Sequence, residues 1–450
     1  MKTIILGAGK IGTALVESFI EENQEVTVID IDARKVENVV KKFDVKGIVG
    51  NGFEKDVLLE AGVETADFFI SCASLDELNI MCCILAKNAG AKNTVARVRK
   101  PEFFKEKQNI RANFGIDMII NPEYRTAREI AHVLKFPAAI SVENFADGRV
   151  NLIGLNIGEG NIIIGKTVMQ VIKDYNFSVI FAMVKRGEKV YVPHGDFILE
   201  EDDEIYMIGK SSDLVSFCKK LHIFKMPVKT LFVVGGGKIA YYLAKELEQS
   251  GIDIKILESD EERCKELAAD FSKVNVLHGD GTDREVLDEE DLKNSDAFVS
   301  LTGVDEENVI VSLYAEQLKV RKVITKVTRP TIINMVKSLG LTSVVSPQSV
   351  IANNVIRFVR SRQVEVGNKV NKFFKLGENA EALEFTVGEN FKGIGVKLKD
   401  LKFKNNVLIG FIAHGEDVIM PNGNSVISVG DKVLVIALAN QITDLSEIIK

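Results

Sequence analysis

The sequence predicts an α/β protein in which two doubly wound parallel sheets are each followed by a small α+β module. Three observations carry this prediction. An apolar strand runs into a glycine-rich turn and then a helix near the start, and the same arrangement returns from residue 231. Strands and helices alternate regularly after each turn, as in parallel sheets with crossover helices. Shorter strands separated by turns follow each alternating region, so we interpret the chain as a tandem duplication.

The first glycine turn has the spacing of a nucleotide-binding turn. The apolar run at residues 2–6 leads directly into Gly7-Ala8-Gly9-Lys10-Ile11-Gly12. In such a turn the first glycine permits the tight bend, the second lets the backbone approach a pyrophosphate, and the third lets the helix pack against the strand. The helix expected at residues 10–22 directs its free N–H groups and its dipole at the phosphates. Lys10 adds a positive charge there.

An acidic residue completes this pattern. The second strand, residues 25–29, ends at Asp30, whose carboxylate is placed to accept hydrogen bonds from ribose hydroxyls. A carboxylate would repel a 2′-phosphate, so the pattern favours NAD(H), ADP or ATP over NADP(H). The alternative is that the acid only caps the next helix.

The rest of the first domain continues the alternation and ends with a helix from Pro122 to about residue 134. Asn51, Ala73 and Ser74 each follow an expected strand, and Arg97 lies near the carboxyl end of another, residues 94–98. Because ligands of open α/β sheets bind at the carboxyl ends of the strands, we expect these residues to lie beside the glycine turn. The small residues Ala73 and Ser74 leave space for a bound adenosine. Five shorter strands and one helical piece, at about residues 167–173, then predict the small module.

The second half repeats the plan at a nearly constant offset. Its turn is Gly235-Gly236-Gly237-Lys238-Ile239-Ala240, with alanine in place of the third glycine, and its acid is Glu258. Both lie 228 positions after their counterparts, whereas Asp280, Thr302 and Lys326 lie 229 positions after theirs. The expected domains are residues 1–137 and 227–365, which bind nucleotide, and residues 138–226 and 366–450, which form the small modules.

The composition excludes several classes of function and binding site. The net charge of −7 and the pI near 5.6 argue against non-specific nucleic-acid binding, which depends on clustered Lys and Arg. The five cysteines form no CxxC pair and the five histidines are scattered, so no disulfide framework and no metal site is expected. No apolar run approaches the ~18 residues of a membrane helix. With no signal peptide expected either, the chain is expected in the cytoplasm, with any membrane role supplied by a partner.

Together these features resemble the TrkA family of tandem RCK proteins, the peripheral regulatory subunits of Trk-type potassium uptake. The resemblance covers nearly the whole chain, and the doubled order of domains is more specific than any single motif. It implies that the Rossmann (RCK-N) domains bind NAD(H) or an adenine nucleotide, ATP or ADP, and that the RCK-C modules help to sense and assemble. It also implies that four chains form a ring on the inner face of the membrane, below an integral K⁺ channel subunit that the ring opens or closes.

The resemblance assigns roles to matching positions in both halves. Gly7 to Ile11 would wrap the pyrophosphate, Asp30 would hold the adenosine ribose, Asn51, Ala73 and Ser74 would line the adenine side, and Arg97 would reach a phosphate or the second ribose. Gly235 to Ile239, Glu258, Asp280, Thr302 and Lys326 would play the matching parts. Lys326 replaces an arginine and loses its bidentate fork.

Two other functions fit the sequence less well. An NAD-dependent oxidoreductase would need a general acid or base and a substrate pocket. The sequence presents no such group beyond the nucleotide framework, so no catalytic residue and no enzyme activity is expected. A redox-sensing transcription factor is disfavoured by the acidic charge and by the lack of a visible helix-turn-helix.

Overall fold

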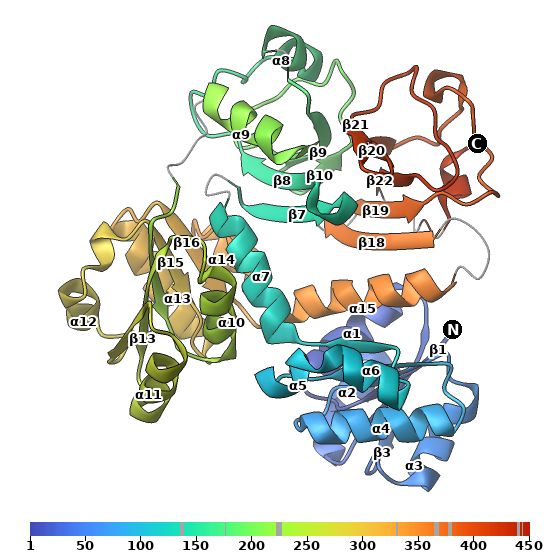
Figure 1. Ribbon diagram of the computed structural model, residues 1–450, viewed down its shortest axis with the longest axis vertical. Helices are drawn as coiled ribbons and strands as arrows, with labels where there is room; N and C mark the ends of the chain where they lie inside the picture. The colour runs from blue at the N-terminus through green and yellow to red at the C-terminus, as the bar shows by residue number, and fades with distance from the viewer. Residues whose placement is uncertain are drawn as a thin grey trace. The chain divides into compact units, whose positions relative to one another are not determined.

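The computed structural model describes residues 1–135, 139–175, 177–221, 227–329, 332–363, 369–376, 380–438, 442 and 444–450. It divides into two compact units, Met1–Arg128 with Thr230–Phe358 and Glu129–Lys229 with Val359–Lys450. The first unit holds both glycine turns, and the second holds the antiparallel modules (Figure 1). The predicted boundaries at residues 137, 226 and 365 fall outside the described residues and remain predictions.

The first domain is a six-stranded parallel sheet in the order β3-β2-β1-β4-β5-β6. Its strands are β1 (Lys2–Leu6), β2 (Glu25–Asp30), β3 (Lys46–Val49), β4 (Phe68–Ser71), β5 (Asn93–Arg97) and β6 (Met118–Ile120). Its helices are α1 (Lys10–Glu21), α2 (Ala33–Phe43), α3 (Lys55–Glu60), α4 (Asp76–Asn88), α5 (Pro101–Lys105), α6 (Lys107–Phe114) and the start of α7 (Pro122–Lys135). Right-handed crossovers place α1 and α2 on one face and α3 and α4 on the other.

The layers and the strand order account for the apolar strands and for the position of the glycine turn. A sheet covered on both faces needs strands that are apolar throughout, and all four residues of β4 are buried. The order reverses between β1 and β4, so their carboxyl ends diverge into a crevice. The glycine turn follows β1 at this point. The fold therefore places the predicted turn where open α/β sheets bind ligands.

The second domain has the same topology, β14-β13-β12-β15-β16-β17, all parallel. Its strands are β12 (Thr230–Val234), β13 (Asp253–Glu258), β14 (Val274–His278), β15 (Ala297–Ser300), β16 (Lys322–Lys326) and β17 (Val344–Val345). Its helices are α10 (Lys238–Leu247), α11 (Glu261–Asp270), α12 (Arg284–Glu289), α13 (Asp305–Gln317), α14 (Ile333–Ser338) and α15 (Pro347–Gln363).

Each small module is a five-stranded antiparallel sheet. The first contains β7 (Ser141–Phe145), β8 (Val150–Asn156), β9 (Ile180–Arg186), β10 (Lys189–Tyr191) and β11 (Glu204–Gly209), with α8 (Val168–Tyr175) and α9 (Ser211–Lys220). The second contains β18 (Lys369–Leu376), β19 (Ala380–Thr386), β20 (Val407–His414), β21 (Asp417–Ile419) and β22 (Lys432–Leu438). Buried residues of both sheets, including Phe145 and Phe411, form one hydrophobic core, so the two modules share an interior.

Three local features differ from the expectation. The sequence predicts one helix starting at Pro101, whereas the structure has two, α5 and α6, because the backbone at Glu106 leaves the helical region. Helix α9 was not predicted, although Leu214, Phe217 and Cys218 are buried at helical spacing. In the second module a single 3₁₀ turn, Leu398–Asp400, stands where α8 stands in the first. Among the described residues, no helix combines the length and hydropathy that crossing a bilayer requires.

Candidate functional site

The first glycine turn has a separate structural reason for each glycine. Gly7 has φ +103°, and a Cβ there would lie 2.9 Å from the carbonyl carbon of Cys72 at the end of β4. A Cβ on Gly12 would lie 1.8 Å from the carbonyl oxygen of Gly7, so the helix packs against the turn more closely than any side chain allows. A Cβ on Gly9 would meet no atom within 4 Å. Packing therefore explains the first and third glycines, whereas the second borders open space that a phosphate could enter.

The Asp30 carboxylate is bound to this turn. Its Oδ2 accepts a hydrogen bond of 2.7 Å from the backbone N–H of Ala8, and its Oδ1 accepts one of 2.9 Å from the N–H of Asp32. Helix α2 is capped by Asp32, whose side chain accepts from the N–H of Arg34. The alternative that Asp30 only caps the next helix is wrong. Its carboxylate lies at the rim of the crevice, beside the space next to Gly9.

The remaining predicted residues of the first site lie along the same edge of the sheet. Ala73 is partly buried and Ser74 is exposed, directly after β4. The buried side chain of Asn79 on α4 fixes this end, because it accepts from the N–H of Ala73 and donates to the carbonyls of Ala73 and Arg97, at 2.7, 3.1 and 3.0 Å. The Asn51 side chain accepts from the N–H of Phe53 and shapes its own turn.

Arg97 belongs to a charged group that the sequence did not reveal. Its Nη2 lies 3.6 Å from Oε1 of Glu123, and Nε of Arg99 donates to the same oxygen at 2.7 Å. Asp76 accepts from the backbone N–H groups of Arg99 and Lys100 and so fixes the loop after β5. Within the described residues, the buried Nε of Arg97 and Oε2 of Glu123 have no hydrogen-bond partner. The side chains of Arg97 and Arg99 are 13% and 33% exposed, so part of each stays accessible to an anion.

The second turn repeats this geometry with small changes. Gly235 has φ +96°, and a Cβ on Gly237 would meet no atom within 4 Å. Oε2 of Glu258 accepts from the N–H of Gly236 at 2.6 Å, whereas Asp260 caps α11. The Arg263 side chain also donates to the carbonyl of Gly236, at 2.9 Å. A carboxylate therefore holds the turn in both domains.

Lys326 and Thr302 adjoin the second turn, and the Asp280 side chain holds the loop after β14. Lys326 is buried and donates to the backbone carbonyls of Leu301 and Thr302, which border the Cβ position of Gly235. Burial lowers the pKa of Lys326, while the nearby Asp305 carboxylate opposes that shift. Asp280 accepts from the N–H and hydroxyl of Thr282, and these hydrogen bonds lower its pKa.

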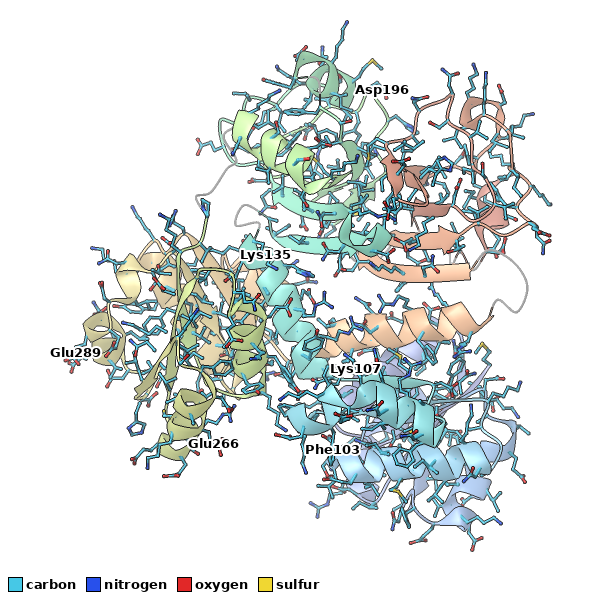
Figure 2. The ribbon with its side chains drawn as sticks, in the orientation of Figure 1. Phe103, Lys107, Lys135, Asp196, Glu266 and Glu289 are labelled. Carbon is cyan, nitrogen blue, oxygen red and sulfur yellow. The ribbon has the colours of Figure 1, made fainter. Side chains whose placement is uncertain are left out.

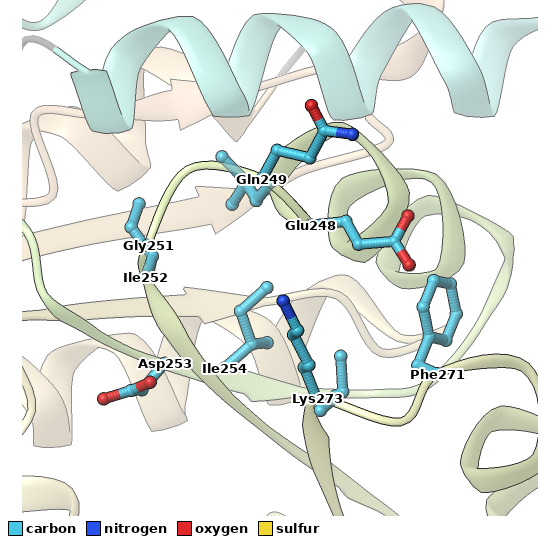
Figure 3. Close-up of a pocket in the computed structure, with 10 residues that line it drawn as sticks. Glu248, Gln249, Gly251, Ile252, Asp253, Ile254, Phe271 and Lys273 are labelled. Atoms are coloured by element: carbon cyan, nitrogen blue, oxygen red, sulfur yellow. The ribbon is translucent and has the colours of Figure 1, made fainter.

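A cavity of about 360 Å³ lies elsewhere, at the end of the second sheet where its strands begin (Figure 3). It is lined by Leu247, Glu248, Gln249, Gly251, Ile252, Asp253, Ile254, Phe271, Lys273 and Val274. These residues surround the start of β13, whereas parallel sheets bind ligands at the ends of their strands. The cavity is therefore separate from the glycine turns.

Family models match the chain twice over. The TrkA-N domain model matches residues 3–122 and 231–347, and the TrkA-C domain model matches residues 152–222 and 382–450. A protein of Archaeoglobus fulgidus named "Trk system potassium uptake protein TrkA homolog" is 32% identical over 451 aligned residues, which span 100% of both chains. The duplication and the order of domains are thus shared with full-length relatives.

Solved structures share the tandem fold. The crystal structure of the GsuK RCK domain aligns with a TM-score of 0.64 at 17% identity, covering 97% of this chain and 92% of that one. The GsuK channel bound to NAD aligns with a TM-score of 0.63 at 17% identity, covering 97% of this chain and 76% of that one. Similarity at this identity establishes the architecture of two Rossmann domains with their small modules.

Proposed function

The chain belongs to the TrkA family, and from that premise we propose that it is a peripheral regulatory subunit of a Trk-type potassium uptake system. It binds NAD(H), or ATP or ADP, at its glycine turns. Nucleotide binding changes the conformation of a ring of such chains, and the ring gates an integral membrane K⁺ channel subunit. The chain acts on the cytoplasmic side of the membrane through that partner.

One observation carries the nucleotide-binding part. In both domains an acidic side chain at the end of the second strand accepts a hydrogen bond from the glycine turn, Asp30 from Ala8 and Glu258 from Gly236. These carboxylates keep lone pairs that can accept from ribose hydroxyls. Their negative charge opposes a 2′-phosphate, which favours NAD(H) over NADP(H).

Each side chain has a defined task when nucleotide is bound. The N–H groups at the start of α1 and α10, after Gly9 and Gly237, receive the phosphates. Lys10 and Arg97 supply positive charge in the first site, and Lys238 and Lys326 supply it in the second. Ala73 and Thr302 border the adenosine. The GsuK channel bound to NAD, which shares the tandem fold, supports this choice of ligand.

Self-association is supported by matched apolar residues at the N-caps and in the N-terminal halves of α4 and α13. Leu75 and Met81 are 59% and 43% exposed, and Val304 and Ile310, 229 positions later, are 45% and 66% exposed. Large apolar side chains exposed at the same place in both repeats indicate contact surfaces. A ring of chains would bury them.

The mechanism is a population shift. A nucleotide that binds one ring shape more tightly than another stabilises that shape, by no more than the difference in its binding free energies. Coupling between sites is usually about 1–3 kcal/mol, and several identical sites in a ring add their contributions. That sum is sufficient to move a gate between two states of similar free energy.

Calorimetric titration tests the proposal. NADH, NAD⁺, ATP, ADP and NADPH are each titrated into the wild type and into Asp30→Ala and Glu258→Ala. We expect NAD(H) or an adenine nucleotide to bind, NADPH to bind more weakly than NADH, and each variant to lose one class of sites. If no nucleotide binds the wild type, the glycine turns are only scaffold. Potassium flux through vesicles containing the membrane subunit, with and without nucleotide, then tests gating.

A further inference from the structure

A buried hydrogen-bonded contact between the two Rossmann domains of the first unit ends on a loop of the first nucleotide site. The hydroxyl of Tyr242, on α10, donates to the backbone carbonyl of Arg99 at 3.1 Å. It accepts from Nδ2 of Asn121 at 2.9 Å, and the same amide nitrogen lies 3.4 Å from the Arg99 carbonyl. Tyr242 and Asn121 are 6% and 1% exposed.

This hydroxyl completes the anchoring of the arginine loop. Asp76 holds the loop by the N–H groups of Arg99 and Lys100, and Tyr242 holds the carbonyl of Arg99 from the other domain. Asn121, whose Oδ1 accepts from the N–H of Tyr124, directly precedes the helix that carries Glu123. The Tyr242 hydroxyl therefore fixes both the loop after β5, which carries Arg99, and the start of the helix that carries Glu123.

The ring of Tyr242 is packed as firmly as its hydroxyl. It makes edge contacts with Phe104 and Tyr124, at centroid distances of 6.3 and 5.5 Å. Lys107, on α6, is labelled in Figure 2. Its ammonium lies 4.2 Å from the Phe104 ring centroid and 5.5 Å from that of Tyr124. Burial raises the pKa of Tyr242, so its hydroxyl remains a donor at neutral pH. Replacing tyrosine by phenylalanine would keep this packing and remove only the hydrogen bonds.

Within the described ranges, no matching hydrogen bond runs from the first Rossmann domain to the corresponding loop of the second. The position of Tyr242 in the first domain is held by Ala14, 228 residues earlier. The loop after β16, which matches the arginine loop, has Thr328 where the first domain has Arg99. Asp305 holds Thr328 as Asp76 holds Arg99. The hydrogen bond from the other Rossmann domain is thus a feature of the first site.

We propose that Tyr242 is a positioning residue for nucleotide binding at the first site, although it belongs to the second Rossmann domain. Its hydroxyl orients the loop that presents Arg97 and Arg99 to the phosphates. The inference rests on the proposed nucleotide-binding function. The first site then depends on a residue of each Rossmann domain. Helix α10, which carries Tyr242, also forms the phosphate-facing helix of the second site.

The test measures NAD⁺ affinity by calorimetry in the Glu258→Ala background, where the first site is observed alone. Tyr242→Phe should weaken binding about fivefold, the effect of one lost hydrogen bond. Tyr241→Phe is the matched control, because the neighbouring Tyr241 ring packs on Phe271 within the second domain. It should bind as the background does. Equal denaturation midpoints for the two variants show that the effect is not one of folding.

A double-mutant cycle separates positioning from general stability. In a chain that also carries Arg97→Ala and Arg99→Ala, Tyr242→Phe should cause no further loss, because the side chains it positions are gone. An unchanged affinity for Tyr242→Phe, an equal loss for Tyr241→Phe, or a fivefold loss that persists without the arginines would each overturn the inference. If none of NAD(H), ATP and ADP binds the wild type, the proposed function is overturned and the inference with it.

Discussion

Substitutions at Gly9 and Gly12 should separate nucleotide binding from folding. Gly9 has φ −76° and ψ −173°, a conformation open to any residue, and its Cβ would meet no atom within 4 Å. Gly9→Val should therefore change the free energy of unfolding by less than about 1 kcal/mol. The new side chain fills the space beside the first turn of α1. If it blocks two phosphate hydrogen bonds of about 1.5 kcal/mol or more each, affinity falls at least about a hundredfold.

Gly12→Ala should show the reverse pattern. Its Cβ would lie 1.8 Å from the carbonyl oxygen of Gly7, so the helix or the turn must move. Overpacking of this kind costs about 1–3 kcal/mol of folding free energy. The second domain has Ala240 at this position, so an alanine is compatible with the fold when the helix is built around it.

Urea denaturation and calorimetric titration with NAD⁺ measure the two effects on the same samples. Gly237→Val is the matched control in the second turn, since its Cβ would also meet no atom within 4 Å. Normal binding by Gly9→Val would refute the assignment of this space to phosphate. An unchanged urea midpoint for Gly12→Ala would refute the packing argument.

Two further predictions concern surfaces and thiols. Met81→Glu combined with Ile310→Glu should lower the mass of the assembly in light scattering, because both place charge on the exposed apolar surfaces; an unchanged mass would show that the surfaces do not mediate assembly. Burial raises the pKa of Cys72 to about 12, so its thiolate fraction at pH 8 is about 10⁻⁴ and native protein should resist alkylation there. Because the folded pKa exceeds that of an unfolded thiol, this burial should lower stability as pH rises above about 9, and fast alkylation of native Cys72 at pH 8 would contradict it.

Features that depend on neighbours in sequence were predictable. The two turns, the strands that precede them and the acids that follow have fixed local spacing. The doubled pattern predicted the identical strand orders, since crossover connections leave few topologies open. Sequence alone could not decide whether Asp30 caps a helix. That depended on which of two nearby carboxylates, Asp30 or Asp32, faces the turn.

Contacts between distant segments were not predictable. Glu123 reaches Arg99 only because the loop after β5 meets the start of α7. Tyr242 and Asn121 are separated by 121 residues, and neither stands in a recognisable motif. The helical spacing of Leu214, Phe217 and Cys218 was a usable signal for α9 that the surrounding turns concealed.

The repeats differ where phosphate would bind, and this difference has a consequence for regulation. The first site has two guanidinium groups sharing Glu123, whereas the second has Lys326, whose ammonium is already bonded to backbone carbonyls. An arginine fork binds phosphate oxygens in pairs and lysine does not, so the first site should hold nucleotide more tightly. If α10 links the sites, thermodynamic linkage requires that filling either one change the affinity of the other by the same factor. Comparing nucleotide affinities in the wild type with those in Asp30→Ala and Glu258→Ala therefore tests this reciprocity. The comparison does not depend on which nucleotide opens the channel.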